Sequence, residues 1–509
     1  MSTILEQYKD KINGIFSFFD RMIIKGRIRQ FFSTSGKGFF LSEQNVLLKD
    51  FSAYANQVTA DIVSHTENMA ASDKRPLIYL TSSNTSKEQT ALQVLQRHPV
   101  DEGLICILSV VEYCQTLQPK KHDSGLPSLD TVNRKCKYYY FYFFDKHFGF
   151  MHVKLQTWFP FLIQVYINGR EMMKHVFDEN DISYQMYDNS FFEISDIAKA
   201  QELADRFDSK SLCRQLDLFA HKVNPYLDTI EKTFYQGYHW CVDQCEYATD
   251  VMFRSREALE DVYPSLIGYA FYGFNCTDVF SFLGRKLRHK FQGEAVSDYR
   301  KRPEGWRIKF KMKSNSIKMY DKFSCLRVEM TINAPKEFKV YKDVHHEDGT
   351  TSKRWVPMGK SIANLYRYAE ISKAANKRFL NFMQNIIPAK TIEKEINSIC
   401  SRKKLKGRSY SGYNVWSADT FLLFETVSDG KYLIRGFTNR EIRHSINRNN
   451  PDSARVKGQT SREFSKLRAH GLIRKIPHSR RYLVSDKGRR VMGALIEAKR
   501  KIYAEFAAK

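Results

Sequence analysis

The sequence is poor in the cysteine pairs that bind structural metals. Its nine cysteines are scattered, and no two of them are separated by only two residues. Cys241 and Cys245 lie four positions apart, but no second pair stands at the spacing that a tetrahedral zinc site requires. An odd, scattered set of thiols is also untypical of a secreted, disulfide-bonded protein. We therefore expect a reduced, cytoplasmic protein without a structural zinc.

Long apolar runs are also missing. The longest, Tyr138–Phe144 and Trp158–Ile167, are far shorter than the ~20 residues that cross a bilayer. Met1–Asp20 mixes charged and apolar residues at helical spacing and does not resemble a secretory signal. No internal repeat and no low-complexity linker occurs. These absences indicate a protein without a membrane partner.

Positive charge is concentrated in the second half of the chain. Residues 401–509 contain 26 Lys and Arg against 9 Asp and Glu, and residues 281–360 contain 20 against 9. The whole chain has a net charge of +25, so the first 280 residues are slightly acidic. A basic surplus confined to one part of a chain is typical of a polyanion partner. We expect that partner to be nucleic acid, DNA in preference to RNA.

Apolar periodicity predicts a mostly helical region over residues 1–130. Apolar residues recur every three or four positions in Ile4–Arg29 and in Asn45–Ser64, which predicts amphipathic helices there. A polar turn ending at Ser86 is placed to cap a further helix over Lys87–Arg97. Residues 131–400 alternate strand and helix patterns and form the predicted α/β body.

An aromatic block opens this body. Lys137–Ile167 (137–167) is rich in aromatic and β-branched residues and is divided by turn signals, so it predicts several long strands. Tyr138–Phe144 is almost wholly aromatic. Such a strand can be sheet core, or it can stack the bases of a single-stranded nucleic acid. The sequence leaves both interpretations open.

A second strand pattern lies at residues 306–333. Apolar and polar residues alternate in Arg307–Met312, Ile317–Tyr320 and Leu326–Asn333, which predicts a three-stranded antiparallel meander with one apolar face. The other face is expected to point outward and to carry Arg307, Lys309, Lys311, Lys318, Tyr320, Arg327 and Glu329. Like charges in a row repel one another unless an anion neutralises them, so a phosphate backbone is the expected ligand. Glu329 is either an ion-pair partner, or a metal ligand or general base beside a phosphodiester.

Ile317–Lys322 followed by Leu326–Glu329 resembles the Tyr-Asp-Lys…Leu-Arg-x-Glu segment of rolling-circle replication initiators from phages and plasmids. The resemblance implies a tyrosine that nicks one DNA strand and a divalent ion, Mg²⁺ or Mn²⁺, held by a His-x-His motif. No His-x-His occurs in this chain. The catalytic residues that the resemblance implies are Tyr320, Asp321, Lys322 and Glu329, with Arg327 beside them. Tyr366 and Tyr368, on a predicted helix over Ser361–Met383, are alternative nucleophiles, and the candidate metal ligands are Gln244, Glu246 and Asp250.

The C-terminal region, residues 410–509, has the clearest pattern. Thr438-Asn-Arg-Glu441 is a capping box, and Arg455–His470 predicts a second helix that stops before Gly471. Two short strands, Leu472–Ile476 and Arg481–Val484, then precede a basic helix. This order resembles the winged helix-turn-helix domain of MarR-type regulators. The predicted nucleic-acid-binding residues there are Arg462, Ser465 and Lys466 on the helix and Lys475, His478, Arg480 and Arg481 on the wing.

Together these patterns predict an α+β protein whose mixed or antiparallel sheet body, flanked by helices, carries a C-terminal winged helix. The favoured function is DNA processing for a mobile or replicating element, by strand nicking or replication initiation, with the winged helix locating the site. A non-catalytic DNA- or RNA-binding protein, either a regulator or a ribonucleoprotein partner, is the alternative. A homodimer is compatible with both.

Overall fold

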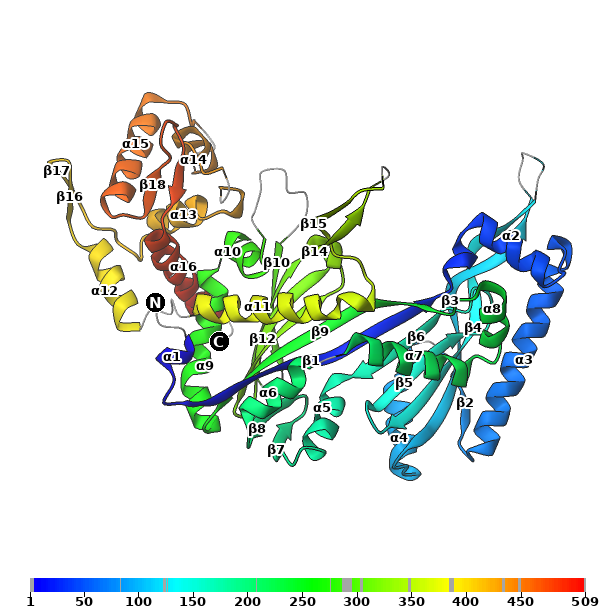
Figure 1. Ribbon diagram of the computed structural model, residues 1–509. Helices are drawn as coiled ribbons and strands as arrows, with labels where there is room; N and C mark the ends of the chain where they lie inside the picture. Colours follow the sequence, from blue (N-terminus) through cyan, green and yellow to red (C-terminus); the bar gives the residue numbers. More distant parts are fainter. Residues whose placement is uncertain are drawn as a thin grey trace.

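One 11-stranded sheet organises the chain in the computed structural model (Figure 1). The structure describes residues 4–82, 84–121, 125, 127–206, 208–274, 276–285, 295–302, 305–346, 349–383, 389–432, 435–446 and 450–507. In spatial order the strands are β10 (Ala295–Arg302), β11 (Gly305–Met312), β12 (Asn315–Lys322), β13 (Cys325–Ile332), β9 (His239–Phe253), β1 (Ile12–Arg27), β6 (Ile163–Asn168), β5 (Gly149–Gln156), β4 (Ser128–Asp145), β3 (Gly103–Lys120) and β2 (Leu77–Tyr79). Neighbours are antiparallel except β2 and β3, which are parallel. The fold is therefore α+β with a mixed sheet and flanking helices.

The prediction of helices over Ile4–Arg29 is wrong for most of that stretch. Only α1 (Ile4–Gln7) is helical before Ile12–Arg27 becomes the central strand β1. Phe16–Phe19 is buried on both sides. A strand buried on both faces is a near-continuous apolar run, and such a run also matches helical spacing. The β-branched and aromatic residues that fill the run favour the strand.

Helices cover both faces of the sheet (Figure 1). The face that bears Tyr247 and Val328 is covered by α11 (Leu365–Met383), whose Asn376 donates hydrogen bonds to both backbone carbonyls. Further helices on this side are α2 (Thr34–Glu43), α3 (Phe51–Ser72), α7 (Ser209–Val223), α8 (Leu227–Phe234), α9 (Arg256–Gly273) and α10 (Cys276–Phe282), with 3₁₀ turns at Arg29–Phe32, Leu48–Asp50, Pro335–Glu337, Ile362–Asn364 and Gly430–Tyr432 elsewhere in the chain. In the described ranges, no helix is long and apolar enough to cross a membrane.

The opposite face carries α4 (Lys87–Arg97), α5 (Gly169–Asp178), α6 (Ile197–Asp205) and the hairpin β7 (Tyr184–Tyr187)–β8 (Ser190–Ile194). Met173 and Phe177 of α5 pack with Phe16 and Phe18 of β1 in a core of their own. The predicted cap of α4 is confirmed, because Ser86 Oγ accepts from the Gln89 amide. These elements determine which side chains of the central strands can reach water.

The aromatic block is core. Tyr138–Phe143 of β4 are each at most 7% exposed, with alternate rings packing on the two faces of the sheet. The interpretation of this strand as a base-stacking surface is therefore wrong, and its interpretation as sheet core is confirmed.

Residues 389–507 form a region with a separate hydrophobic core that includes Phe424, Phe437, Phe464 and Leu467. Its elements are α12 (Ala389–Cys400), β16 (Lys403–Leu405), β17 (Arg408–Tyr410), α13 (Ala418–Val427), α14 (Asn439–Ile446), α15 (Ala454–Ala469), β18 (Ile473–Lys475), β19 (Tyr482–Val484) and α16 (Asp486–Ala507). The predicted capping box is confirmed, since the Thr438 amide donates to Glu441 and the Glu441 amide to Thr438 Oγ1. Gly471, with φ of +74°, ends α15 as predicted.

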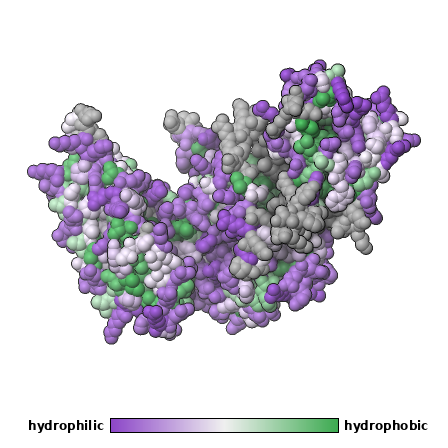
Figure 2. Space-filling view, turned by 180° about the vertical axis from the view of Figure 1, so that it is seen from behind, coloured by the Kyte–Doolittle hydropathy of each residue, from purple (hydrophilic) through white to green (hydrophobic). Residues whose placement is uncertain are grey.

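Two features lie outside these layers. The hairpin β14 (Lys339–His345)–β15 (Thr351–Pro357) projects from the body as a separate two-stranded ribbon (Figure 1). The surface seen in Figure 2 is mainly hydrophilic, with only small and separated apolar areas.

Gly169 is the closest approach of α5 to the central strand β1. A Cβ at this position would lie 1.9 Å from the carbonyl oxygen of Phe19, whereas a Cβ at Gly38 in α2 would meet nothing within 4 Å. We expect Gly169→Ala to lower the free energy of unfolding by about 3 kcal/mol, because α5 must move off the sheet. Gly38→Ala should raise it by about 1 kcal/mol, since alanine favours an exposed helix. Urea unfolding of both variants checks this, and equal effects would contradict it.

Candidate functional site

Three carboxylates from three adjacent central strands meet in the interior. Asp20 of β1, Glu246 of β9 and Glu329 of β13 are each less than 5% exposed. One carboxylate oxygen from each lies within 4.8 Å of the other two. Burying three acidic groups together is unfavourable unless cations or a metal ion compensate them. This convergence is the strongest candidate for a functional site in the described part of the sheet body.

A β-bulge places Asp20 in this group. Phe19 pairs with Tyr247 and Arg21 pairs with Glu246, so Asp20 is an additional residue in β1 without a partner of its own on β9. The bulge turns the side chains of both Asp20 and Arg21 to the face that carries Glu246. Bulges often re-aim side chains in this way near functional sites. In the sequence the signal was a charged pair inside the apolar run of β1, and its meaning depended on a partner strand more than 200 residues away.

Basic side chains balance the acids. The fully buried Arg327 places Nη2 at 2.9 Å from Asp20 Oδ1 and Nη1 at 3.1 Å from Asp250 Oδ1. Lys318 Nζ lies 2.6 Å from Glu329 Oε1, and Arg21 Nη2 lies 2.5 Å from Glu246 Oε2. We call the following eight residues the polar cluster: Asp20, Glu246, Asp250 and Glu329 with Arg21, Arg170, Lys318 and Arg327. Each carboxyl group of the cluster has a basic side chain within ion-pair distance.

Two carboxylate oxygens of the cluster are incompletely satisfied. Asp20 Oδ1 and Glu329 Oε1 have a cation nearby, at 2.9 and 2.6 Å, but no described donor is aligned to hydrogen-bond to either oxygen. Both belong to the group of three carboxylates that lie within 4.8 Å of one another. These lone pairs are free to bind a hard cation. The three carboxylates are thus able to hold a metal ion, in competition with Arg327 and Lys318.

Tyr320 lies against this group. Its hydroxyl donates to Glu329 Oε2 at 3.0 Å and accepts from Asn189 Nδ2 at 2.9 Å. The guanidinium of Arg302 lies over its ring, 4.7 Å from the centroid. Burial, together with the charge of Glu329, raises the pKa of Tyr320 well above its ordinary value. The hydroxyl is therefore protonated at neutral pH and is held as a hydrogen-bond donor.

The turn between β7 and β8 covers the site. Asp188 pairs with Lys322 Nζ at 2.6 Å, and the carbonyl of Asn189 accepts from Arg327 Nη1 at 2.5 Å. Tyr320 and Lys322 are each 4% exposed as a result. A phosphodiester reaches Tyr320 only if this turn moves away.

The prediction that the polar face of the meander points outward is wrong for Tyr320, Arg327 and Glu329. Arg327 and Glu329 are buried, and so are Tyr320 and Lys322, where the β7–β8 hairpin packs over that face. Only Lys311 is exposed on the corresponding face of β11, while Arg307 and Lys309 are half-buried. Arg307 pairs with Asp298, 3.2 Å away. The alternation of side chains along these strands was predicted correctly. The layer that covers their polar face comes from segments that are distant in the sequence.

The remaining predicted residues of the body differ in how they relate to the carboxylate group. Gln244 donates its side-chain amide to Glu246 Oε1 at 2.8 Å, so its nitrogen and not its oxygen faces that carboxylate. Asp250 is held by Arg327 and by the Phe191 amide. Asp321 alternates with Tyr320 along β12 and therefore points to the other face. Asp20 and Asn189, which the sequence did not single out, take part in the contacts described above.

The alternative nucleophiles lie elsewhere. Tyr366 and Tyr368 belong to α11, which packs on the face opposite to the polar cluster. Tyr368 is fully buried there, and Tyr366 is 55% exposed. Among the three tyrosines considered, only Tyr320 contacts the acidic group.

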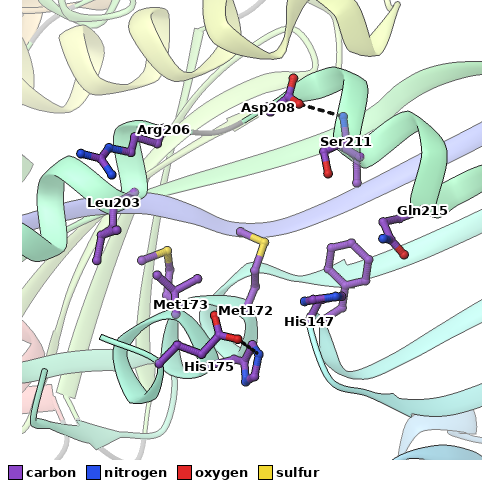
Figure 3. A pocket seen from close by; sticks show the side chains of 14 residues that line it. His147, Met172, Met173, His175, Leu203, Arg206, Asp208, Ser211 and Gln215 are labelled. Atoms are coloured by element: carbon purple, nitrogen blue, oxygen red, sulfur yellow. Dashed lines mark hydrogen bonds and ion pairs between the residues drawn. The ribbon is translucent and has the colours of Figure 1, made fainter. Parts of the chain in front are cut away.

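A separate cavity of about 320 Å³ lies between α5, α6 and α7 (Figure 3). Its wall includes the methionines Met172 and Met173 and two imidazoles, His147 and His175, whose ring centroids are 5.9 Å apart. None of the residues that line it belongs to the polar cluster. We therefore assign it no part in the chemistry of Tyr320.

The predicted nucleic-acid-binding residues of the C-terminal region differ in their exposure. Arg462, Lys475, His478 and Arg480 are exposed. Ser465 bonds to the Ser461 carbonyl, and the Lys466 ammonium lies 4.0 Å from the centroid of the Tyr413 ring. Arg481 pairs with Glu441 at 2.8 Å and donates to the Gly436 carbonyl, so it ties β19 to the start of α14.

Asp250 has an unusual protonation equilibrium. Burial raises its pKa to about 7, although Arg327 and the Phe191 amide oppose that shift. Glu246 behaves differently: burial raises its pKa, but Lys318 and Arg21 outweigh burial and hold it below the usual value. Because the folded state keeps a proton on Asp250 that the unfolded chain releases near pH 4, this residue favours folding less as pH rises from 4 to 7.

Asp250→Asn tests this equilibrium. Asparagine imitates the protonated carboxyl, so the stability of wild type relative to the variant should fall between pH 5 and 8, by on the order of 2–4 kcal/mol. Urea unfolding at both pH values measures the difference. A relative stability that instead rises with pH would show that Asp250 is ionised beside Arg327 throughout.

Comparisons of the chain with models of protein families, with curated proteins and with solved structures found no match. The two resemblances described from the sequence therefore stay predictions that rest on the residues quoted for them.

Proposed function

We propose that this protein binds duplex DNA through residues 435–507, folded as a winged helix. One observation carries the proposal. Helix α15 buries Phe464 and Leu467 beneath it and presents Arg462 to solvent, beside a two-stranded hairpin whose exposed turn carries Arg480. A helix followed by a β-hairpin wing is the geometry by which such modules enter a major groove and hold the flanking backbone.

The charge of this surface supports a polyanion ligand. Seven cations on α15 and the hairpin are exposed: Arg455, Lys457, Arg462, Arg468, Arg474, Lys475 and Arg480. Within the described part of the region, none of them forms an ion pair. Unpaired surface cations gain most from neutralising phosphates, because counterions are released from DNA when they bind. Arg481 is excluded from this set because Glu441 already holds it.

Arg462 and Arg480 are expected to act differently. Arg462→Ala should broaden the set of sequences selected from random duplexes, since an arginine on a recognition helix reads guanine. Arg480→Ala should weaken binding to every duplex alike and reduce the slope of log Kd against log salt by about 1. Arg97→Ala, an exposed cation on α4 in the slightly acidic half, is the control. Identical losses for both variants on all sequences would show that α15 does not read bases.

A second function, cleavage of a DNA strand by Tyr320, is favoured by the meeting of Asp20, Glu246 and Glu329 beside its hydroxyl. Carboxylate oxygens suit Mg²⁺ or Mn²⁺, and such an ion would polarise the scissile phosphate. Glu329 is placed to accept the Tyr320 proton at 3.0 Å. The tyrosine oxygen would then form a bond to phosphorus, and the bond between phosphorus and the 3′ oxygen would break. The leaving 3′ oxygen would take up the proton that Glu329 received, which gives a 3′ hydroxyl.

DNA binding and strand cleavage require different changes in the structure. The C-terminal surface is already exposed and needs no rearrangement to bind DNA. Cleavage requires the β7–β8 turn to leave Tyr320 and a metal ion to compete with Arg327 and Lys318 for the carboxylates. We therefore place DNA binding first and strand cleavage second.

Covalent trapping tests strand cleavage. Incubation with labelled single-stranded and supercoiled DNA plus Mn²⁺ should give a protein–DNA adduct that Tyr320→Phe abolishes and Tyr366→Phe retains. Asn189→Ala removes a hydrogen bond that holds Tyr320, so it should increase the yield of adduct. If no adduct forms with wild type or with Asn189→Ala, the protein binds DNA without cutting it.

A further inference from the structure

The hairpin β14–β15 displays an aromatic pair that no packing explains. Tyr341 and Trp355 lie directly opposite each other in the register of the two strands, with ring centroids 5.5 Å apart. They are 51% and 54% exposed. The base of the ribbon is anchored differently, by the buried side chain of Val340 and by a bond from the Met358 amide to the Phe338 carbonyl. About half of each aromatic side chain is therefore left uncovered by the body.

A guanidinium extends the aromatic surface. Arg367 of α11 lies over the Trp355 ring, 5.3 Å from the centroid. It is fixed there by the Lys339 carbonyl, 3.0 Å from its Nε, and by Glu370, 2.8 Å from its Nη1. Planar groups held in this way offer flat faces at a low loss of conformational entropy. Arginine and aromatic faces are the surfaces on which unpaired bases stack.

The ribbon also carries unbalanced positive charge. Lys339 and Lys353 lie on the same face as the aromatic pair, because each is two positions from Tyr341 or Trp355 along its strand. Asp343 stands directly opposite Lys353 on this face, so the cations there outnumber the acid by two to one. On the reverse face Lys342 stands directly opposite Arg354. Both are exposed, and neither is ion-paired to any residue that the structure describes. Like charges directly opposite across a strand pair repel each other, and an anion beside them removes that cost.

We propose that the hairpin β14–β15 binds single-stranded nucleic acid, with bases stacked on Trp355 and Tyr341 and phosphates beside Lys339 and Lys353. An unpaired strand fits better than a duplex, because paired bases do not expose their faces. The flanking cations favour a nucleic acid over an apolar protein segment. This inference deepens the proposed function by adding a site for an unpaired strand to a protein that also holds duplex at α15.

The geometry permits both sites to be occupied together. In Figure 1 the hairpin and the C-terminal region project to the same, upper side of the body, on separate elements. A nucleic acid with a duplex segment joined to an unpaired segment matches this arrangement. The ligand class is therefore a junction between duplex and single strand.

Fluorescence anisotropy with labelled oligonucleotides tests the inference. Trp355→Ala should weaken binding of a mixed-sequence 20-mer single strand by on the order of tenfold or more, and Tyr341→Ala should act in the same direction. Neither variant should change binding of the matching duplex. Trp355→Phe keeps an aromatic face and should restore most of the affinity. Trp416→Ala, which removes an exposed tryptophan of the C-terminal region, is the matched control. Parallel titrations with DNA and RNA strands show which of the two is preferred.

The two proposals fail separately. Unchanged single-strand affinity in Trp355→Ala overturns the hairpin site, whatever the duplex result. Equal losses on single strand and duplex also overturn it, because they show that the hairpin does not discriminate unpaired bases. Loss of single-strand binding in Trp355→Ala supports the site even if Arg462→Ala leaves duplex binding unchanged, an outcome that would instead contradict the role of α15.

Discussion

The fully buried guanidinium of Arg327 is the charge on which the sheet body depends. A buried arginine stays ionised, so its cost of desolvation must be met by partners at close range. Those partners come from β1 through Asp20, from β9 through Asp250, and from the β7–β8 turn through the Asn189 carbonyl. Elements distant in sequence are thus held in one arrangement by one side chain. Removing any one of these partners leaves part of the buried guanidinium without a contact that compensates its desolvation.

The polar cluster has two uses that compete. Its four acidic and four basic side chains contact one another and fix the positions of α5 and β7–β8 on the sheet. As an acidic group beside Tyr320, it offers oxygen ligands for a cation. The same contacts that make the cluster stable also reduce its affinity for metal, because Lys318 and Arg327 already neutralise the carboxylates. The C-terminal surface has no such conflict, since Arg462 and Arg480 are exposed and form no ion pair with any residue that the structure describes.

Local patterns predicted the elements whose neighbours are close in sequence. The meander, the capping box at Thr438 and the end of α15 at Gly471 depend on residues within a turn or a hairpin, and they appear where expected. The strand β1 was mistaken for a helix because its segment Phe16–Asp20 is buried on both faces and shows no alternation there. Burial of Arg327 and Glu329 was missed because the layer that covers them comes from residues 169–205. Asp20 joined the site through a bulge, which no local pattern reveals.

The aromatic pair of the hairpin β14–β15 could not be predicted from the amino-acid composition. The chain is rich in aromatic residues, and most of them lie in the core, so composition does not indicate which two are exposed. Their register on a projecting ribbon, with Arg367 stacked behind, is what sets them apart. Function on such a surface depends on exposure, which only the packed structure supplies.

The place of β1 in the sheet has a consequence for synthesis of the protein. Arg21 meets Glu246 across 225 residues of sequence, so one side of the first strand lacks its partner while that length of chain is made. At about 5–20 residues per second, the interval is roughly 10–45 s. During it an apolar strand buried on both faces in the finished protein exposes unpaired backbone groups, the condition under which strands pair with other chains. The central strand is thus a segment of the nascent chain that is open to aggregation until β9 has been made.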